Sequence, residues 1–210
     1  TKHYTFGIDT SIKGTAGEGT QSKTGEFIKI NTDGDVSYNE KGEVTKTEKT
    51  ELLNGAEFQL HIGSATGGLF TNAEGKNTFV TDEKGRLEIN GLDSDVEYYL
   101  VETKAPTGYK LLATAIKVKI TASFAEDVLT GYTVDINGAP THYTYNEKDG
   151  ITTLVNDEKN PSNPFGFENT KLGELPSTGG MGTYLFTIVG VVLMACAAGA
   201  FFMSRKKTQE

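Results

Sequence analysis

Three polar residues in this sequence have the types and predicted positions to form an amide bond between two side chains. Lys29, Glu102 and Asn169 each lie in a short run that alternates apolar and polar residues, and each faces the same way as its apolar neighbours. These neighbours are Phe27 for the lysine, Tyr98 and Leu100 for the glutamate, and Phe165 and Phe167 for the asparagine. We therefore expect all three polar side chains to be buried in one core.

Burial gives this set its chemistry. A charged amine or carboxylate is costly in a core, so burial lowers the pKa of Lys29 and raises the pKa of Glu102. A neutral amine is a nucleophile and can attack the carboxamide carbon of Asn169. The protonated carboxyl can hydrogen-bond the carboxamide oxygen and relay protons as ammonia leaves. The predicted product is an amide cross-link between the lysine and the asparagine.

Other residues could take the same parts. Lys46 and Lys13 also lie close to predicted strands and are alternative amines, and Asn156 is an alternative amide. We rank Lys29 first because Phe27 occupies the same predicted face. In a simpler alternative, the lysine and the glutamate form an exposed ion pair that contributes little to stability.

A second chemical feature is a short substrate-like motif near the end of the chain. Pro176 fixes its own φ and favours an extended conformation for the preceding leucine, while Gly179 permits close approach of another protein. The Thr178 carbonyl is therefore predicted to be an accessible electrophile. The complete motif is Leu175, Pro176, Ser177, Thr178 and Gly179.

An uncharged apolar run follows this motif at residues 181–203, and Arg205, Lys206 and Lys207 come directly after it. As a helix, the run is long enough to span a bilayer core of about 30 Å. Basic residues after a membrane helix stay on the cytoplasmic side, so the preceding chain is expected outside the cell.

The motif, the apolar run and the basic tail together resemble the cell-wall sorting signal of Gram-positive LPxTG surface proteins. The resemblance implies that a sortase cysteine attacks between Thr178 and Gly179, forms a thioester on the threonine, and passes that acyl group to an amine. It also implies that everything after Thr178 is removed, so that the membrane helix is transient. The simpler alternative is a single-pass membrane protein with an accidental LPSTG sequence.

The elements that must position these residues are strands. Alternating apolar residues predict strands, and Asn-Gly and Asp-Gly pairs predict turns between them. Before the membrane run there is no helical period of useful length, so the predicted class is all-β, as a sandwich. The main predicted strands lie near residues 4–9, 26–30, 55–60, 87–92, 98–102, 115–123, 131–136, 141–146, 151–155 and 165–170.

Composition excludes several other functions. A net charge of −8 argues against nucleic acid as a partner. The single cysteine, Cys196, lies in the apolar run, so the exported part cannot form an internal disulfide. His3, His61 and His142 are scattered without a nucleophile or metal-ligand spacing. We therefore expect no enzyme active site, cofactor or metal, and only a single-turnover, autocatalytic cross-link.

Five segments, FIKINTDG, LNGAEFQL, GRLEINGL, YYLVETKAPTGY and FENT, are similar to successive signatures of the Cna B-type domain. This family has an immunoglobulin-like fold with a self-forming isopeptide bond and occurs in Gram-positive pilins and adhesins. The resemblance implies that Lys29 is the first-strand lysine, Glu102 the catalytic glutamate and Asn169 the last-strand asparagine. The segment 31–54 departs from the family because it is long for the first loop.

Together these features predict a structural subunit of a sortase-assembled pilus on a Gram-positive cell wall. The expected partners are a sortase, neighbouring pilin subunits or the peptidoglycan cross-bridge, and a host surface ligand. The alternative is a monomeric wall-anchored adhesin in which this domain is a stalk. We expect a longer precursor with upstream domains. The predicted divisions are 1–25 as a strand and loop entering from a preceding domain, 26–172 as the Cna B-type domain, 173–180 as the linker with the motif, 181–203 as the membrane helix, and 204–210 as the cytoplasmic tail.

Overall fold

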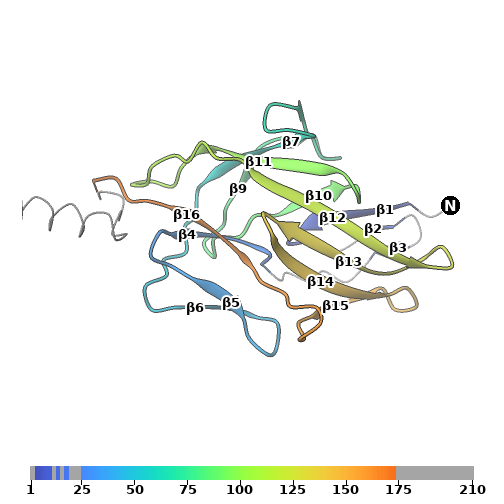
Figure 1. The fold of residues 1–210 in the computed structure, drawn as a ribbon. Coiled ribbons are helices and arrows are strands. Elements are labelled where there is room, and N and C mark those ends of the chain that lie inside the picture. Colours follow the sequence, from blue (N-terminus) through green and yellow to red (C-terminus); the bar gives the residue numbers. More distant parts are fainter. Residues whose placement is uncertain (1–2, 11–12, 15–16, 19–24, 174–210) are drawn as a thin grey trace, which may run out of the picture. The chain divides into compact units, whose positions relative to one another are not determined.

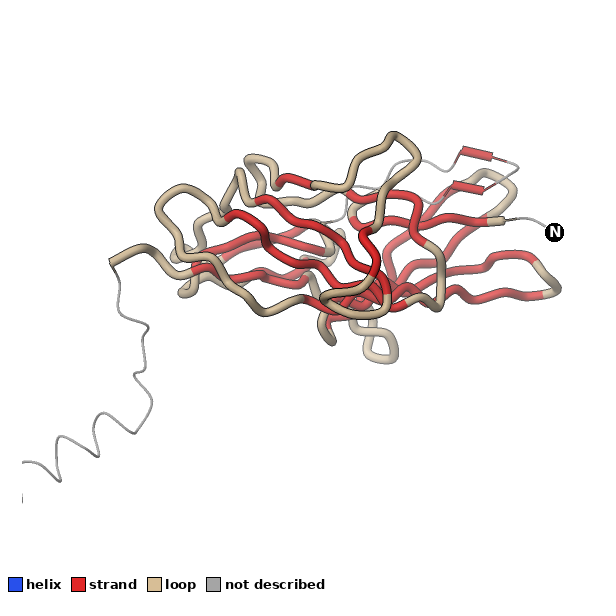
Figure 2. The backbone as a smooth tube through the Cα atoms, turned by 90° about the horizontal axis from the view of Figure 1, so that it is seen from above, coloured by secondary structure: helices blue, strands red, loops and turns tan. Residues whose placement is uncertain are grey.

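A computed structural model of the chain describes residues 3–10, 13–14, 17–18 and 25–173. Figure 2 shows that this part consists of strands and loops, which confirms the predicted all-β class. The predicted membrane helix at 181–203 lies outside the described residues. Among the residues that are described, no helix has the length and apolar character needed to cross a membrane.

The largest sheet is antiparallel and has the strand order β15-β14-β13-β12-β11-β7-β8, with β9 also paired to β7. Consecutive strands from β11 to β15 are neighbours, so this half of the sheet is a meander. Its strands are β7 Glu57–Ile62, β8 Gly68–Leu69, β9 Phe79–Val80, β11 Glu97–Lys104, β12 Ile116–Ala125, β13 Val128–Ile136, β14 Ala139–Asn146 and β15 Ile151–Val155.

The turns between these strands follow the predicted chemistry. Asn137 and Gly138 connect β13 to β14 with φ angles of 53° and 87°, the left-handed conformation that a tight hairpin turn requires. Gly150, with φ of 69°, ends the turn between β14 and β15. The predicted Asn-Gly and Asp-Gly turns are therefore correct, and they fix the register of the meander.

A second sheet has the order β10-β1-β2-β3 and begins with the first strand of the chain. Phe6 and Ile8 of β1 are fully buried in the main core, and β1 pairs with β10. Burial of these side chains joins β1 to the rest of one compact unit, Thr1–Leu172. The strands are β1 Tyr4–Ile8, β2 Lys13–Gly14, β3 Gly17–Glu18 and β10 Ile89–Leu92.

The strand β4 (Phe27–Asn31) pairs in parallel with β16 (Phe165–Asn169), the last strand of the unit. Figure 1 shows the two running side by side. Phe27 faces the main core, whereas Ile28 and Ile30 belong to a second apolar cluster with Val36. Parallel strands of this kind are usually covered on both faces.

The long segment after β4 supplies the cover for its second face. It forms the hairpin of β5 (Val36–Tyr38) and β6 (Val44–Lys46), and the connection between these strands contains Lys41 and Gly42. Val44 and Leu52 pack against the second cluster. The insertion therefore covers the second face of β4, so that the strand is buried on both faces.

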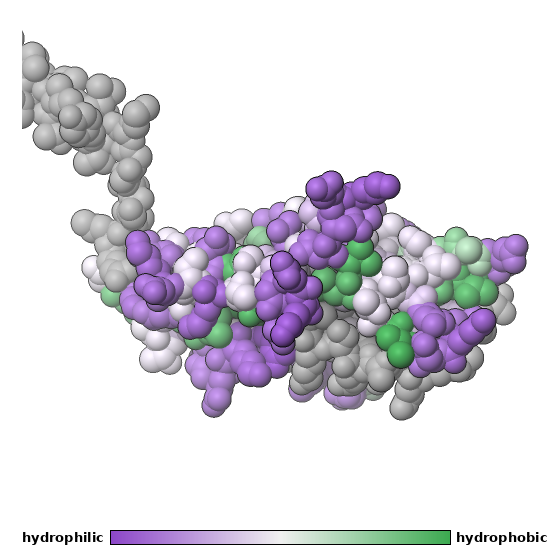
Figure 3. Space-filling model, turned by 90° about the horizontal axis from the view of Figure 1, so that it is seen from below, coloured by the Kyte–Doolittle hydropathy of each residue, from purple (hydrophilic) through white to green (hydrophobic). Residues whose placement is uncertain are grey.

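The outer surface is mainly polar, in keeping with the acidic composition. On the face drawn in Figure 3, hydrophilic residues predominate and hydrophobic residues form separate small patches. The described residues place their large apolar side chains mostly inside, in one cluster shared by both sheets and in the smaller cluster behind β4. Burial of that apolar area is the main source of the unit's stability.

Candidate functional site: a buried amine, amide and carboxyl

Parallel pairing of β4 and β16 brings the predicted amine and amide together. Lys29 lies opposite Phe167 in the register, and its side chain extends along the pair toward Asn169. The Lys29 amine donates hydrogen bonds to the Asn169 side-chain oxygen Oδ1 and, at 3.0 Å, to the Phe167 carbonyl. The two side chains therefore meet although they are 140 positions apart in the sequence.

Glu102, on β11, completes the set from the opposite sheet. Its two carboxyl oxygens accept hydrogen bonds from Asn169 Nδ2 at 3.1 and 3.0 Å, and one of them lies 3.8 Å from Lys29 Nζ. The carboxyl thus contacts the amide nitrogen, which is the leaving group. The predicted contact was with the amide oxygen, and this part of the prediction is wrong. This position suits transfer of a proton from the amine to the departing ammonia.

The site excludes water. The Lys29 and Glu102 side chains have no exposed surface, which contradicts the alternative of an exposed ion pair. Lys29 Nζ lies 4.0 Å from the centre of the Phe167 ring, and the rings of Phe27 and Phe58 pack against that ring. Burial lowers the pKa of Lys29 to about 7, against the opposing effect of the Glu102 charge. Near neutral pH, a substantial fraction of this amine is therefore unprotonated and nucleophilic.

Backbone groups hold the lysine in place. The Lys29 N–H donates to the Gly85 carbonyl at 2.7 Å, and its carbonyl accepts from Leu53 N–H at 2.9 Å. Gly85 has φ of 69°, and a side chain there would bring a Cβ to 2.6 Å from the Lys29 carbonyl oxygen. Only glycine fits this close approach without displacement of β4.

A loop after β11 supplies two further contacts that alternation could not reveal. Asn169 Nδ2 donates to the Lys110 carbonyl at 2.9 Å, and Leu112 N–H donates to Glu102 at 3.1 Å. The loop is shaped by a turn closed from Tyr109 N–H to the Pro106 carbonyl. The APTGY segment marks this turn in the sequence, but backbone partners leave no signal in residue type.

The alternative residues lie elsewhere. Lys46 is exposed on β6 and donates to the Thr50 carbonyl, and Asn156 is exposed with its side-chain oxygen bonded to Ser162 N–H. Lys13 lies in β2, which pairs with β1 and β3 rather than with β16. The structure therefore brings together only the first-ranked residues among these candidates.

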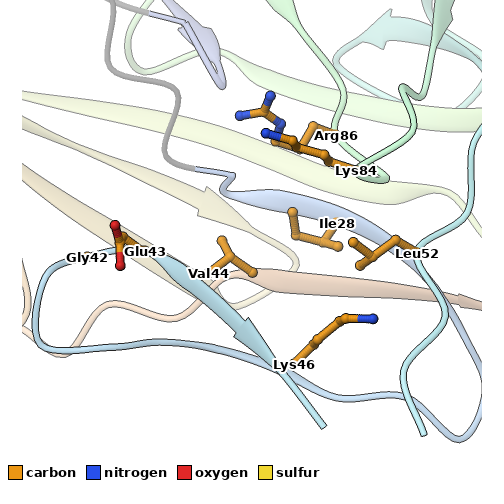
Figure 4. A pocket seen from close by; sticks show the side chains of 8 residues that line it. All are labelled: Ile28, Gly42, Glu43, Val44, Lys46, Leu52, Lys84 and Arg86. Atoms are coloured by element: carbon orange, nitrogen blue, oxygen red, sulfur yellow. The ribbon is translucent and has the colours of Figure 1, made fainter. Parts of the chain in front are cut away.

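A separate hollow of about 420 Å³ lies behind β4, between that strand and the β5–β6 hairpin. Figure 4 shows Ile28, Val44 and Leu52 in this hollow, with the cationic side chains of Lys84 and Arg86 at its rim. The hollow lies on the second face of β4 and is not lined by Lys29. It is distinct from the amine, amide and carboxyl site.

Two family models match parts of the chain. Residues 40–135 match the SpaA prealbumin-like fold domain, and residues 168–210 match the LPXTG cell wall anchor motif. The predicted sortase motif, Leu175 to Gly179, lies outside the described residues but inside the second match.

The chain is also similar to curated and solved proteins. It is 29% identical over 162 residues to the trypsin-resistant surface T6 protein of Streptococcus pyogenes serotype M6, covering 74% of this chain and 25% of that protein. The chain thus spans about a quarter of the length of this relative.

Two solved structures have lower similarity. The group B streptococcus pilus 2b backbone protein has 24% identity and a TM-score of 0.37, with 80% of this chain and 50% of that chain covered. BcpA, the major pilin subunit of Bacillus cereus, has 22% identity and a TM-score of 0.34, with 68% and 27% covered. From the two domain matches, the chain is a cell-wall-anchored surface protein with a prealbumin-like domain and an LPXTG motif, and its resemblance to sortase-anchored pilins is confirmed.

Proposed function

We propose that the chain is a structural subunit of a sortase-assembled pilus, stiffened by an isopeptide bond between Lys29 and Asn169. The observation that carries the proposal is the buried contact of the Lys29 amine with the Asn169 carboxamide beside Glu102. A permanent bond at this position suits a chain that is anchored at one end and carries load, and that has no cysteine in its exported part.

The bond-forming step needs no partner or cofactor. Glu102 accepts a proton from the Lys29 amine, and the neutral amine attacks the Asn169 side-chain carbon. The protonated carboxyl returns this proton to Nδ2, the bond between the carbon and Nδ2 breaks, and the nitrogen leaves as ammonia. The nitrogen from Lys29 then gives its surplus proton to the Glu102 carboxylate, so that the new amide is neutral. One amide is consumed and one is formed, so the reaction occurs once per chain.

The reaction that joins this chain to a neighbouring molecule uses the LPSTG motif near the C-terminus. A sortase thiolate attacks the Thr178 carbonyl, the peptide bond to Gly179 breaks, and the residues from Gly179 onward leave with a free amine. An amine of a neighbouring subunit or of the peptidoglycan cross-bridge then attacks the thioester. The thiol is released and a new amide bond links Thr178 to that amine.

Cell-wall extracts from cells that express the full-length precursor test the joining step. Blots after boiling in detergent should show a ladder of covalent multimers, and replacement Thr178→Ala should abolish it. Because this variant retains Lys29, Glu102 and Asn169, it should still form the internal bond. A single band from the unaltered precursor contradicts the pilus role and favours the monomeric wall-anchored adhesin.

A further inference from the structure

The first strand of the unit lies outside the segment that the proposed cross-link would close. Strand β1 spans Tyr4–Ile8, whereas the bond joins Lys29 to Asn169. A force applied to the two ends of the unit therefore acts on β1 before it acts on the bond. The covalent link can shield the chain between its two attachment points, but it cannot shield β1.

Packing and backbone pairing hold the middle of strand β1 in the core. Phe6 packs against Tyr132, with 5.1 Å between ring centroids, and Ile8 is fully buried. The backbone pairs with β10 through Phe6 opposite Leu92 and Ile8 opposite Ile89. These contacts stabilise the folded unit but can separate without breaking a covalent bond.

A buried polar cluster fastens the end of β1 to the start of β4. The Asp9 N–H donates to Glu26 at 2.5 Å, and the Gly25 N–H donates back to the Asp9 carboxyl. The Tyr143 hydroxyl donates to the second Glu26 oxygen. Asp9 and Glu26 are 1% and 2% exposed, so both carboxyls lie out of contact with bulk water.

The charges around this cluster compensate the two carboxyls only in part. Arg86 Nε lies 3.7 Å from Asp9, but the carboxylates of Asp82 and Glu88 act on Asp9 in the opposite sense. Among the described residues, the ionisable neighbours of Glu26 besides Asp9 are Tyr38, Tyr132 and Tyr143. Within this part of the chain, the guanidinium of Arg86 therefore faces two buried acids.

Protonation consequently strengthens the cluster. Burial raises the pKa of Asp9 to about 6, and burial together with the Asp9 charge raises the pKa of Glu26 to about 7. The folded state then binds protons more tightly than the unfolded chain, whose carboxyls titrate near pH 4. Stability from this cluster is complete below that pH and is lost as pH rises through about 6 to 7.

We propose that β1 is a releasable strand, fastened by the Asp9 and Glu26 cluster, that leaves the domain under tension more readily as pH rises. The segment between Lys29 and Asn169 remains folded when β1 separates from the domain. The proposal rests on the proposed function, because the isopeptide bond defines which residues are shielded. Under tension, such a subunit lengthens by one short, fixed amount while the rest of the domain stays folded.

Single-molecule stretching of residues 1–173 held at both ends tests this directly, since Thr1–Leu172 is one compact unit with its own core. Intact mass must first show the loss of one ammonia. Release of the chain before Lys29 then adds up to about 90 Å of extension at about 3.3 Å per residue. The force–extension trace should contain one step of this length and no longer step. The force at which this step occurs should be lower at pH 8 than at pH 5.

Two outcomes overturn the proposal but leave the cross-link unaffected. In the first, no step occurs before the attachments at the chain ends detach. In the second, the step occurs at the same force at both pH values. A step several times longer, in protein whose mass retains the ammonia, contradicts the cross-link and therefore the shielded segment as well. The mass measurement separates this failure from the first two.

Replacement Glu26→Gln removes one titrating group but retains an acceptor for the Asp9 N–H. It should reduce the difference in release force between pH 5 and pH 8 by at least half, and Asp9→Asn should act in the same direction. Glu97→Gln is the matched control because Glu97 is a carboxyl that pairs with Lys117 at the surface. Equal pH dependence in all three variants rules out the cluster as the fastening.

Discussion

Two buried polar clusters lie at the same strand and differ in what they can become. Lys29, within β4, meets an amide and a carboxyl, whereas Glu26, just before β4, meets a second carboxyl and a tyrosine. The first cluster contains a nucleophile and a leaving group, so it can turn into a covalent bond. The second contains only groups that exchange protons. On the proposed function, similar burial therefore gives a permanent bond at the first cluster and pH-dependent stability at the second.

Loss of the covalent bond should give the largest effect. Asn169→Ala removes the electrophile, and closure of a loop of this length contributes roughly 5 kcal/mol to the free energy of unfolding by analogy with a disulfide. Denaturant unfolding at pH 7 should show a loss of at least this size, because the variant also leaves Lys29 buried without its amide. Asn156→Ala, at an exposed position, should lose only the hydrogen bond from Ser162 N–H, which contributes about 1 kcal/mol. Similar midpoints for the two variants contradict the account.

The strand outside the bond should be nearly as sensitive. Phe6→Ala removes a ring that is 2% exposed, and such a cavity costs about 3–5 kcal/mol. Intact mass should nevertheless still show the loss of one ammonia, because the residues that form the bond are unchanged. A variant that unfolds with the same midpoint as the unaltered protein shows that β1 contributes nothing to the core.

A side chain at position 85, close to the Lys29 backbone, should have a smaller effect on the domain. Gly85→Ala places a Cβ 2.6 Å from the Lys29 carbonyl oxygen at a φ of 69°, and the strain is roughly 1–3 kcal/mol. Chains without the bond should accumulate after refolding, measured by intact mass. Gly75→Ala is the matched control, with φ of 80° and nothing within 4 Å of the new Cβ. If both variants form the bond equally fast, the position of β4 does not control the reaction.

The smallest predicted effect is on the rate of bond formation with pH. The pKa of Lys29 is lowered to about 7, so the neutral fraction of the amine rises as pH passes through that value. Chain that has not yet folded, isolated in denaturant from insoluble expressed material and then diluted into buffer, should form the bond roughly ten times faster at pH 8 than at pH 6. The mass of quenched samples follows the reaction. A rate that falls over this range assigns the nucleophile to another group.

The same contrast explains what could be predicted from sequence. Alternation located Lys29, Glu102 and Asn169 because each stands inside a strand, where period two fixes the direction of the side chain. Asp9 and Glu26 stand at the ends of the predicted strands 4–9 and 26–30 but lie just outside β1 and β4, where alternation no longer fixes the side-chain direction, and their burial was missed. The role of β1 was also missed, because local pattern cannot show that Phe6 reaches Tyr132 across the core. Backbone partners such as the Lys110 carbonyl carry no residue signal at all.

Intact mass of residues 1–173 tests the central claim most directly, with Glu102→Gln as the comparison. The account predicts that the unaltered protein is lighter than its sequence by one ammonia and that the variant, allowing for its own substitution, has its full mass. Peptide mapping should place the link between Lys29 and Asn169. Full sequence mass in the unaltered protein, or a link through Lys46, contradicts the account.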